Sequence, residues 1–402
     1  MAAACGLLDA NGSAKPTIFA EMSALAARTS AANLGQGFPD EDGPEWIREV
    51  AIEAIRAGVN QYPPGRGTAE LRQAIAAHQA RRYGIELDAD TEVLVTTGAT
   101  EALAAALLAL TGPGDEVVTL EPFYDSHAAC IAMAGATHVT VPLEPHDGGF
   151  RLDTDALRRA VGPRTRVILV NTPHNPTGTV LTRDELRAIA AEAQRVGAIV
   201  VTDEVYEHLV FDDAEHVPIA SLPGMRERTL TISSSGKTFS LTGWKVGWVT
   251  GPAALIDAVL AVKQFLTFTS GAPFQVAIAQ ALGTGDAGGD ADIAALRDTL
   301  VFRRDLLIDG LTAAGFATVR PDGTYFVCAD ASPFLSNSVP DGAAFARWLP
   351  GAIGVACVPL SAFCRSGSPV AHALANWVRF TFVKREDTLR TAIERLAGLR
   401  LG

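Results

Sequence analysis

From residue 92 onward, short runs rich in β-branched residues alternate with longer segments of helical spacing. The run at residues 199–202 is continuously apolar except at its end, which is typical of a strand covered on both faces. This alternation predicts an α/β fold with a doubly wound, mostly parallel sheet. The expected strands are residues 93–97, 117–120, 137–141, 167–171, 199–203, 229–233 and 246–250. Ligands of such sheets bind beyond the carboxyl ends of the strands, so we expect a functional site there.

Helical spacing also marks the region before the sheet, at residues 19–28, 45–57 and 69–83. A further helix is predicted after Thr182, which forms a capping box with Glu185. The segment NLGQGFPD, residues 33–40, carries two glycines and a proline that disfavour regular structure. Such a loop allows the backbone to approach a ligand closely.

A second, smaller domain is predicted after the glycine-rich stretch GTGDAGG, residues 283–289. A long helix at residues 291–313 follows, then strand-like segments at 324–329, 355–358 and 378–382, and a last helix from Glu386. This order of elements predicts an α+β unit. We find no internal repeat and no low-complexity region.

The composition restricts the class of protein. The chain has 402 residues, of which 48% are hydrophobic and 19% charged, so it can bury a sizeable core. Its net charge of −12 argues against a nucleic-acid-binding surface. The five cysteines show no CxxC spacing and are expected to be reduced thiols. Neither a signal peptide nor a membrane-spanning run is evident, which suits a cytoplasmic protein.

The segment SSSGKTFSLTGWKVGW, residues 233–248, presents Lys237 in a turn of small residues between two predicted buried strands. Burial lowers the pKa of a lysine amine, which suits formation of a Schiff base. A solvated loop lysine would be the simpler interpretation of a lone Gly-Lys pair. Here the rest of the chain supplies matching groups.

An anion site is predicted where Gly98, Ala99 and Thr100 follow one strand and open a helix, because free amides and the helix dipole favour a phosphate there. Many strand–helix turns look alike, so this signal alone is weak. Ser234 and Lys245, on either side of Lys237, can add a hydroxyl and a positive charge.

Polar and aromatic side chains follow the ends of other predicted strands. Asp203 ends the most buried strand, and a carboxylate there needs a partner, either a helix N-terminus or a protonated pyridine nitrogen. Tyr206 follows three residues later. Asn175 lies in NTPHNPTG, where the alternative is an Asx-turn, and Tyr124 lies in EPFYDSH, where the alternative is core packing.

Arg379 lies inside WVRFTF, an alternating strand of the smaller domain. An arginine in an apolar strand needs an anion, and a carboxylate fits its planar fork in a bidentate manner. For an isolated arginine, a structural ion pair would be the simpler interpretation.

Taken together, these residues make the chain resemble the class I aminotransferases among the fold type I pyridoxal-phosphate enzymes. It is most similar to the branch that contains kynurenine and glutamine transaminases, cysteine-S-conjugate β-lyases and actinobacterial N-succinyldiaminopimelate aminotransferases. The resemblance extends from about Phe19 to Leu399. The motifs that carry it, in family order, are NLGQGFPD, NQYPPG, TTGATEAL, EPFYDS, NTPHNPTG, TDEVYEHL, SSGKTFSLTGWKVGW, GTYF and VRFTFVKR.

The resemblance implies a fold, a cofactor and a role for each matching residue. It implies an N-terminal arm that belongs partly to the small domain (residues 1–44), a large cofactor-binding domain with a seven-stranded sheet (45–288) and a small C-terminal domain (289–402). Lys237 would bind pyridoxal 5′-phosphate covalently and transfer protons, and Asp203 would keep the pyridine nitrogen protonated. The other implied roles are phosphate binding by Gly98, Ala99, Thr100, Ser234 and Lys245, hydrogen bonding to the ring oxygen by Asn175 and Tyr206, and ring stacking by Tyr124.

The same resemblance implies how substrate and partner subunit are bound. Arg379, with Asn175 and the Gly37 backbone, would bind the substrate α-carboxylate. Phe19 would line the side-chain pocket. Tyr62 would reach the phosphate of the neighbouring subunit, and Phe268 would come from the partner chain, so a homodimer is expected.

Two positions depart from the family pattern. His127 in EPFYDSH is interpreted as a satisfied, surface-facing imidazole, with a substrate contact as the alternative. Arg66, beside Tyr62, is interpreted as a solvated loop arginine, with a distal substrate carboxylate as the alternative.

Three functions are compatible with parts of this pattern. The first is an aminotransferase that moves an amino group between an L-amino acid and a 2-oxo acid, and the second is a cysteine-S-conjugate C–S β-lyase. Both begin with loss of the Cα proton, so the residues above do not separate them. The third, a transcription regulator with a captured aminotransferase-like domain, is disfavoured because only about 18 residues precede the first family-like helix.

Overall fold

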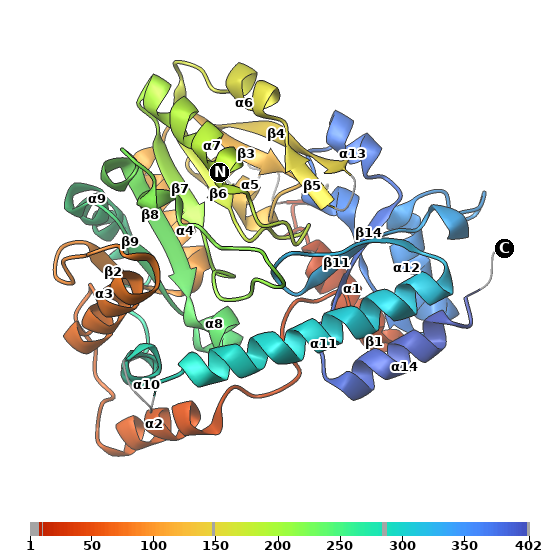
Figure 1. Cartoon of the computed structure of the whole chain (residues 1–402), viewed down its shortest axis with the longest axis horizontal. Helices are drawn as coiled ribbons and strands as arrows, with labels where there is room; N and C mark the ends of the chain where they lie inside the picture. Colours follow the sequence, from red (N-terminus) through yellow and green to blue (C-terminus); the bar gives the residue numbers. More distant parts are fainter. Residues whose placement is uncertain (1–7, 10, 147–148, 284–287, 400–402) are drawn as a thin grey trace.

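An eight-stranded sheet forms the centre of the larger domain (Figure 1). The computed structural model describes residues 8–9, 11–146, 149–283 and 288–399. The strand order is β2–β9–β8–β7–β6–β3–β4–β5. The bounds are β2 (Val93–Thr97), β3 (Glu116–Glu121), β4 (Thr137–His146), β5 (Gly149–Leu152), β6 (Thr165–Asn171), β7 (Ile199–Asp203), β8 (Thr229–Ser234) and β9 (Val246–Thr250). All seven predicted strands are present, and β5 is an additional edge strand.

Both faces of this sheet are buried under helices, as the apolar strands predicted. In β6, Val167 and Leu169 pack on one side and Ile168 and Val170 on the other. The first side is covered by α4 (Gly98–Leu110), α5 (Asp125–Met133) and α9 (Ala253–Lys263). The opposite side is covered by α6 (Thr154–Ala160) and α7 (Arg183–Val196), and nearer β2 by α2 (Glu45–Arg56), α3 (Ala69–Tyr83) and α10 (Ala272–Leu282).

The direction of the strands places the carboxyl ends of most of them at one edge of the sheet. Every strand runs in the same direction except β5 and β9, which pair antiparallel with their neighbours. The carboxyl ends Asn171, Asp203 and Ser234 therefore lie at one edge. Because β9 is reversed, its first residue, Val246, pairs there with Thr97, the last residue of β2.

The smaller domain is built from both ends of the chain. Its antiparallel sheet has the order β10–β11–β14–β13, and a parallel pair joins β1 to β12. The strand bounds are β1 (Ala32–Asn33), β10 (Ala317–Val319), β11 (Phe326–Asp330), β12 (Val355–Ala356), β13 (Val358–Pro359) and β14 (Trp377–Thr381). The helices are α1 (Ile18–Thr29), α11 (Asp290–Ala314), α12 (Gly342–Ala352), α13 (Pro369–Ala373) and α14 (Glu386–Leu396).

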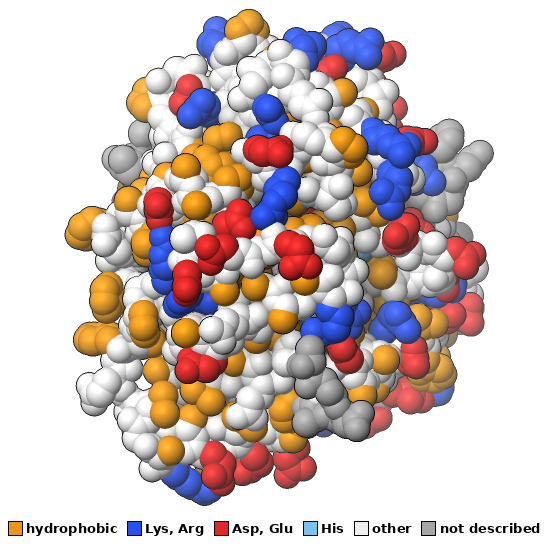
Figure 2. Space-filling view, turned by 60° about the vertical axis from the view of Figure 1, so that its left-hand side comes forward, with side chains coloured by type: hydrophobic (Ala, Val, Ile, Leu, Met, Phe, Trp, Pro, Cys, Tyr) orange, Lys and Arg blue, Asp and Glu red, His pale blue; other side chains and the backbone are white. Residues whose placement is uncertain are grey.

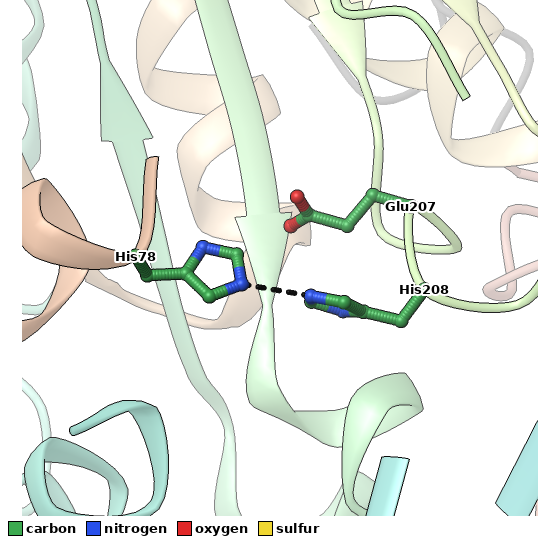
Figure 3. Close-up of side chains that lie close together, drawn as sticks. All are labelled: His78, Glu207 and His208. Atoms are coloured by element: carbon green, nitrogen blue, oxygen red, sulfur yellow. Dashed lines mark hydrogen bonds between the residues drawn. The ribbon is translucent and has the colours of Figure 1, made fainter. Parts of the chain in front are cut away.

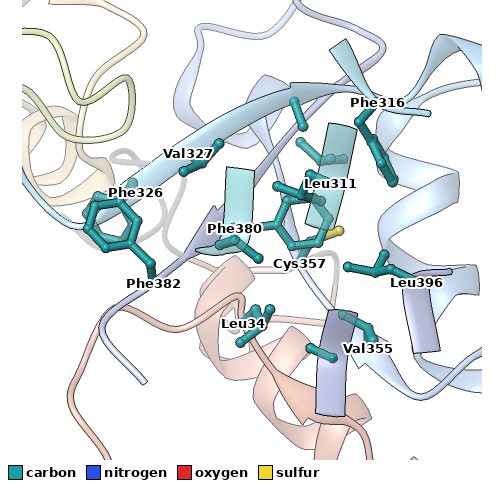
Figure 4. Close-up of a cluster of buried hydrophobic side chains, with 14 of the residues drawn as sticks. Leu34, Leu311, Phe316, Phe326, Val327, Val355, Cys357, Phe380, Phe382 and Leu396 are labelled. Carbon is teal, nitrogen blue, oxygen red and sulfur yellow. The ribbon is translucent and has the colours of Figure 1, made fainter. Parts of the chain in front are cut away.

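Helix α11 connects the two domains, running across the lower part of the molecule in Figure 1, above α2 and α14. Its Ile293 packs into the cluster under β2 and β9, whereas Leu307 and Leu311 pack into the core of the smaller domain. Figure 4 shows that core, in which Leu34 from the N-terminal segment lies among residues such as Phe380 and Leu396 from the C-terminal segments.

The predicted helices agree with the structure to within one or two residues at each end. The capping box is present: Thr182 Oγ1 accepts from Glu185 N at 3.2 Å, and the Glu185 carboxylate accepts from Thr182 N at 2.8 Å. Residues 284–287 of the predicted glycine-rich boundary lie outside the described residues. The domain limits at residues 44 and 288 stay predictions.

The surface carries charges of both signs. On the face drawn in Figure 2, Lys and Arg lie interspersed with Asp and Glu and with smaller hydrophobic areas. None of the described helices combines the length and apolar character that crossing a bilayer requires.

Candidate active site

A cavity of about 450 Å³ opens at the edge of the sheet where the strand ends converge. It brings together most of the site residues predicted from the sequence. These are Phe19, Gly37, Gly98, Ala99, Thr100, Tyr124, Asn175, Asp203, Tyr206, Ser234, Lys237, Lys245 and Arg379. Lys237 and Asp203, 34 residues apart in the chain, thus face one space that can hold a small ligand.

Lys237 lies on the short helix α8 (Ser235–Thr238), directly after β8. Its Nζ donates to Tyr325 Oη at 2.8 Å and to the Gly37 carbonyl at 3.4 Å. The amine is half-buried in the cavity, so the interpretation as a solvated loop lysine is wrong.

Asp203 is buried at the end of β7, and His127 lies behind it. The Asp203 Oδ1 atom accepts from Val205 N at 3.3 Å, and Oδ2 lies 3.4 Å from His127 Nε2. Only 2% of His127 is exposed, so the prediction of a surface-facing imidazole is wrong. Helix α5 begins at Asp125 and turns His127 inward, where its ring packs edge-on against Tyr124.

The N-terminus of α4 contributes backbone amides to the same cavity as Lys237 and forms a cradle there. Thr97, the N-cap, makes no side-chain capping bond, which leaves the first amides of α4 available. Gly98 has φ +76°, and a Cβ there would lie 3.2 Å from Lys245 Nζ. The absence of a side chain at Gly98 therefore lets the Lys245 ammonium and the amides face one point, a suitable phosphate position.

Arg379 projects from β14 and is 1% exposed. Its Nη1 donates to Asn175 Oδ1 at 2.7 Å and its Nη2 to the Gly35 carbonyl at 2.9 Å, whereas Nε has no partner. The guanidinium lies 3.8 Å from the ring centroid of Phe326 and 4.8 Å from that of Phe363. Burial lowers the pKa of Arg379 to about 10.

Those contacts argue against a structural ion pair, because no described carboxylate lies within ion-pair distance of Arg379. A buried cation with an unpartnered N–H requires an anion that the described chain does not supply. A substrate carboxylate fits this requirement.

Three further residues surround the space between Lys237 and Asp203. Tyr206 is 3% exposed, and burial raises the pKa of its phenol well above the usual value, so the hydroxyl stays protonated and can donate. Tyr124 is half-buried, and its ring lies 6.5 Å from that of Phe19. Asn175 keeps its side-chain N–H₂ group for a ligand, because Arg379 occupies its oxygen.

Tyr62 and Phe268 are the two predicted residues that the structure does not bring into the cavity. They are 84% and 46% exposed, and their rings meet edge-on with centroids 5.6 Å apart. Arg66 contacts Asp257 through Nη2. With 22% of its side chain exposed and an acidic partner, it is not the freely solvated loop arginine that the sequence suggested.

Sequence reasoning missed several residues at the site, above all Tyr325, which lies beside the cavity and whose phenol contacts the Lys237 amine. The motif GTYF contained this tyrosine but suggested no role for it. Gln36, Phe38 and Phe326 also line the cavity.

A second buried polar cluster lies behind α8 and consists of His78, Glu207 and His208 (Figure 3). Thr238 Oγ1 donates to the Ser234 carbonyl at 3.3 Å and therefore accepts from His208 Nδ1 at 3.0 Å. His208 Nε2 then accepts from His78 Nε2 at 2.8 Å. Although the three side chains could bracket a metal ion, these bonds already occupy both Nε2 atoms, so we interpret the cluster as a structural link from α3 to α8.

The site fits pyridoxal 5′-phosphate. The cradle at Gly98 and Lys245 suits a phosphate, Asp203 a pyridinium nitrogen, Tyr206 and Asn175 a phenolic oxygen, and Lys237 a carbonyl carbon. The fold and this donor set together define a pyridoxal-phosphate-dependent enzyme of fold type I.

Comparison with known proteins agrees with this class. The family model "Aminotransferase class I and II" matches residues 29–396, and the chain belongs to this family of pyridoxal-phosphate-dependent aminotransferases. It is 57% identical over 387 residues to a probable N-succinyldiaminopimelate aminotransferase of Mycobacterium tuberculosis, covering 95% of this chain and 96% of that protein. It is 40% identical to the methionine aminotransferase of Escherichia coli, covering 95% and 96%. Human kynurenine–oxoglutarate transaminase 3 is 38% identical, covering 94% and 87%.

A solved structure of the N-succinyldiaminopimelate aminotransferase from M. tuberculosis superposes with a TM-score of 0.91 at 56% identity, covering 96% of this chain and 97% of that one. These relatives are named as transferases. The protein is therefore an aminotransferase, and a C–S β-lyase activity is not favoured.

Proposed function

We propose that this aminotransferase exchanges an amino group between N-succinyldiaminopimelate and a 2-oxo acid. The observation that carries this proposal is the difference in identity between relatives. The chain is 57% identical to the relative named for this substrate, against 40% and 38% for those named for methionine and kynurenine.

We further propose the residue roles that the cavity supports. Arg379 binds the substrate α-carboxylate through its N–H groups, while Phe326 and Phe363 keep the guanidinium plane fixed. This contact orients the substrate so that its Cα hydrogen faces Lys237, whose amine removes and returns the proton. Phe19, which lines the cavity from α1, borders the space for the substrate side chain.

The remaining roles concern cofactor binding. When bound, pyridoxal phosphate supplies an electron sink for the negative charge that develops at the substrate Cα. The Asp203 carboxylate holds a proton at the ring nitrogen. Tyr206 and Asn175 donate to the ring oxygen, and Tyr124 covers the ring. Ser234, Lys245 and the amides of Gly98, Ala99 and Thr100 bind the phosphate.

A homodimer is part of the proposal. Tyr62, Phe265, Leu266 and Phe268 are large apolar residues that are between 46% and 84% exposed on the single chain. Such a group is typical of a surface that another protein covers. We propose that a second copy covers it and that Tyr62 and Phe268 complete the partner's site. We also propose a cytoplasmic location, with the cysteines as free thiols.

A transamination panel with purified protein tests the substrate. Donors are N-succinyl-LL-diaminopimelate, methionine and kynurenine, each against the same set of 2-oxo acids, with Lys237→Ala as the inactive control. We expect kcat/KM for the succinylated donor to exceed the others by at least about tenfold. A preference for methionine or kynurenine would overturn the substrate. Release of pyruvate, ammonia and thiol from S-substituted cysteines, without a new amino acid, would overturn the reaction.

A further inference from the structure

Tyr325 reaches the active-site lysine from the smaller domain. It is 1% exposed and directly precedes β11. Its hydroxyl donates to the Gly37 carbonyl at 2.7 Å and lies 2.8 Å from Lys237 Nζ. One phenol therefore joins a strand of the smaller domain, the N-terminal loop and the catalytic helix α8.

The backbone on either side holds this tyrosine firmly. Its carbonyl accepts from Phe382 N at 2.9 Å and from Thr381 Oγ1 at 3.0 Å. Thr324, at φ +67°, donates its N–H to the Leu209 carbonyl at 2.9 Å. The ring packs edge-on against Tyr206, with centroids 5.2 Å apart. Such packing leaves the hydroxyl little freedom to leave the lysine.

The hydrogen bonds have a defined direction. Burial raises the pKa of the Tyr325 phenol, so the hydroxyl keeps its proton at neutral pH. That proton goes to the Gly37 carbonyl, which can only accept. The oxygen therefore meets Lys237 with a lone pair, and the amine donates to it.

We infer that Tyr325 is a positioning residue for Lys237, whose phenol oxygen and the neighbouring Gly37 carbonyl hold the amine whenever it is not bound to the cofactor. This inference rests on the proposed role of Lys237 as the proton carrier. In an aminotransferase cycle the lysine amine is free while the proton at the substrate Cα moves, and a free alkylamine on four rotatable bonds needs a fixed partner to stay in place.

The carbonyls of Gly37 and Gly35, which accept from the Lys237 site and from Arg379, lie close together in the chain. Gly37 belongs to the loop that also carries Gly35, whose carbonyl accepts from Arg379. The group that positions the amine and the group that positions the substrate carboxylate thus share one loop. Tyr325 therefore couples the position of Lys237 to the position of the bound carboxylate.

The test compares Tyr325→Phe with Tyr83→Phe, a control that removes a phenol hydroxyl at the end of α3 whose hydrogen-bond partner is Glu207 and not Lys237. Two properties are measured. The first is the kinetic isotope effect on kcat with a donor deuterated at Cα. The second is the pH dependence of Lys237 acylation in protein saturated with pyridoxamine 5′-phosphate, in which the amine is free, followed by peptide mass spectrometry.

For Tyr325→Phe we expect kcat to fall at least about tenfold with KM changed less than about threefold, and the isotope effect to rise. The acylation midpoint should move to lower pH, because the ammonium form loses an acceptor that stabilised it. Tyr83→Phe should lower stability through loss of its bond to Glu207, but it should leave the isotope effect and the acylation midpoint at their wild-type values. Site-specific 3-fluorotyrosine at position 325, which keeps the ring and hydroxyl but weakens the acceptor, should give smaller shifts in the same direction.

An unchanged isotope effect and acylation midpoint in Tyr325→Phe would overturn the inference, and a lowered melting temperature alone would assign the tyrosine to packing. If the wild-type protein failed to transaminate any donor, the proposed function would fail. The acylation midpoint would still report whether Tyr325 holds the amine.

Discussion

At the scale of single residues, the site is defined by buried charged side chains that line the cavity. Arg379 is buried with one N–H unpartnered, and Asp203 is a buried carboxylate that no described Lys or Arg pairs with. A folded chain tolerates such groups where a ligand completes them. We therefore predict a separate kinetic effect for substitution of each of these two residues.

Replacement of Arg379 should act mainly on substrate binding. In Arg379→Lys we expect KM for the amino donor to rise about 30-fold or more, because lysine cannot present the planar fork that binds a carboxylate. Steady-state kinetics of both substrates measure this. Arg303→Lys is the control, since Arg303 is also buried but pairs with Glu41 outside the cavity. Equal KM values in the two variants would contradict the role of Arg379.

Substitutions of Asp203 and of His127 should both lower kcat, but to different degrees. In Asp203→Asn we expect kcat to fall about a thousandfold while the cofactor stays bound, because the carboxylate no longer holds the ring proton. His127→Gln should lower kcat about tenfold, since His127 acts only through its contact with Asp203. Rapid kinetics with absorbance of the bound cofactor measure both. A His127→Gln enzyme as fast as the wild type would show that this contact is structural.

Most of the predicted site residues that line the cavity lie in short motifs at strand ends, where residue type and position carry the signal. His127 was misjudged because its partner, Asp203, lies 76 residues away, and no local pattern shows which side of α5 faces the sheet. Tyr325 was missed for the same reason. Its function depends on Lys237 and Gly37, 88 and 288 residues away in the chain.

At the scale of elements, the periodic pattern predicted the helices and strands well because both faces of the main sheet are buried. The edge strand β5 was not predicted. It pairs with residues 143–146 of β4, which include Pro145, and Pro142 directly precedes them. Proline is disfavoured in central strands but tolerated at sheet edges and in their neighbours, so the alternation there is weak.

The hydrogen-bond chain between α3 and α8 predicts a pH dependence of stability. Burial lowers the pKa of His78 from 6.5 to about 3. Below pH 6.5 the unfolded chain therefore binds a proton that the folded chain does not, and the free energy of unfolding falls as the pH decreases from 6.5 toward 3.

His78→Gln keeps a donor for His208 and should reduce this slope by up to about 1.4 kcal/mol per pH unit. Urea unfolding at several pH values between 4 and 7 measures it. The control is His372→Gln, at an exposed position, which should leave the slope unchanged. An unaltered slope in His78→Gln would mean that other groups cause the acid sensitivity.

At the scale of the whole molecule, Tyr62 does not line the cavity of its own chain. If Tyr62 serves the partner's phosphate, Lys237→Ala and Tyr62→Ala should complement each other in a mixed dimer. One of its two sites would then hold both an intact lysine and an intact tyrosine. After unfolding and refolding the two variants together, we expect up to about a quarter of wild-type activity, from the statistical half of mixed dimers.

The same mixture measured without joint refolding should show only the residual activity of the separate variants. Sedimentation of each variant measures whether it forms the proposed dimer. If joint refolding gave no gain in activity, Tyr62 would not contribute to the partner's site.

Strand β9 runs antiparallel to its neighbours β2 and β8, and this limits which changes of sequence the proposed cofactor site can accept. One continuous segment, leaving the sheet through β8 and returning through β9, delivers the Lys237 amine at its start and the Lys245 ammonium at its end. A one-residue slip of that return would turn every side chain of β9 to the opposite face. The proposed covalent attachment at Lys237 and the proposed phosphate contact of Lys245 are therefore linked through one segment, and insertions or deletions between positions 238 and 244 should not be able to alter one of them alone.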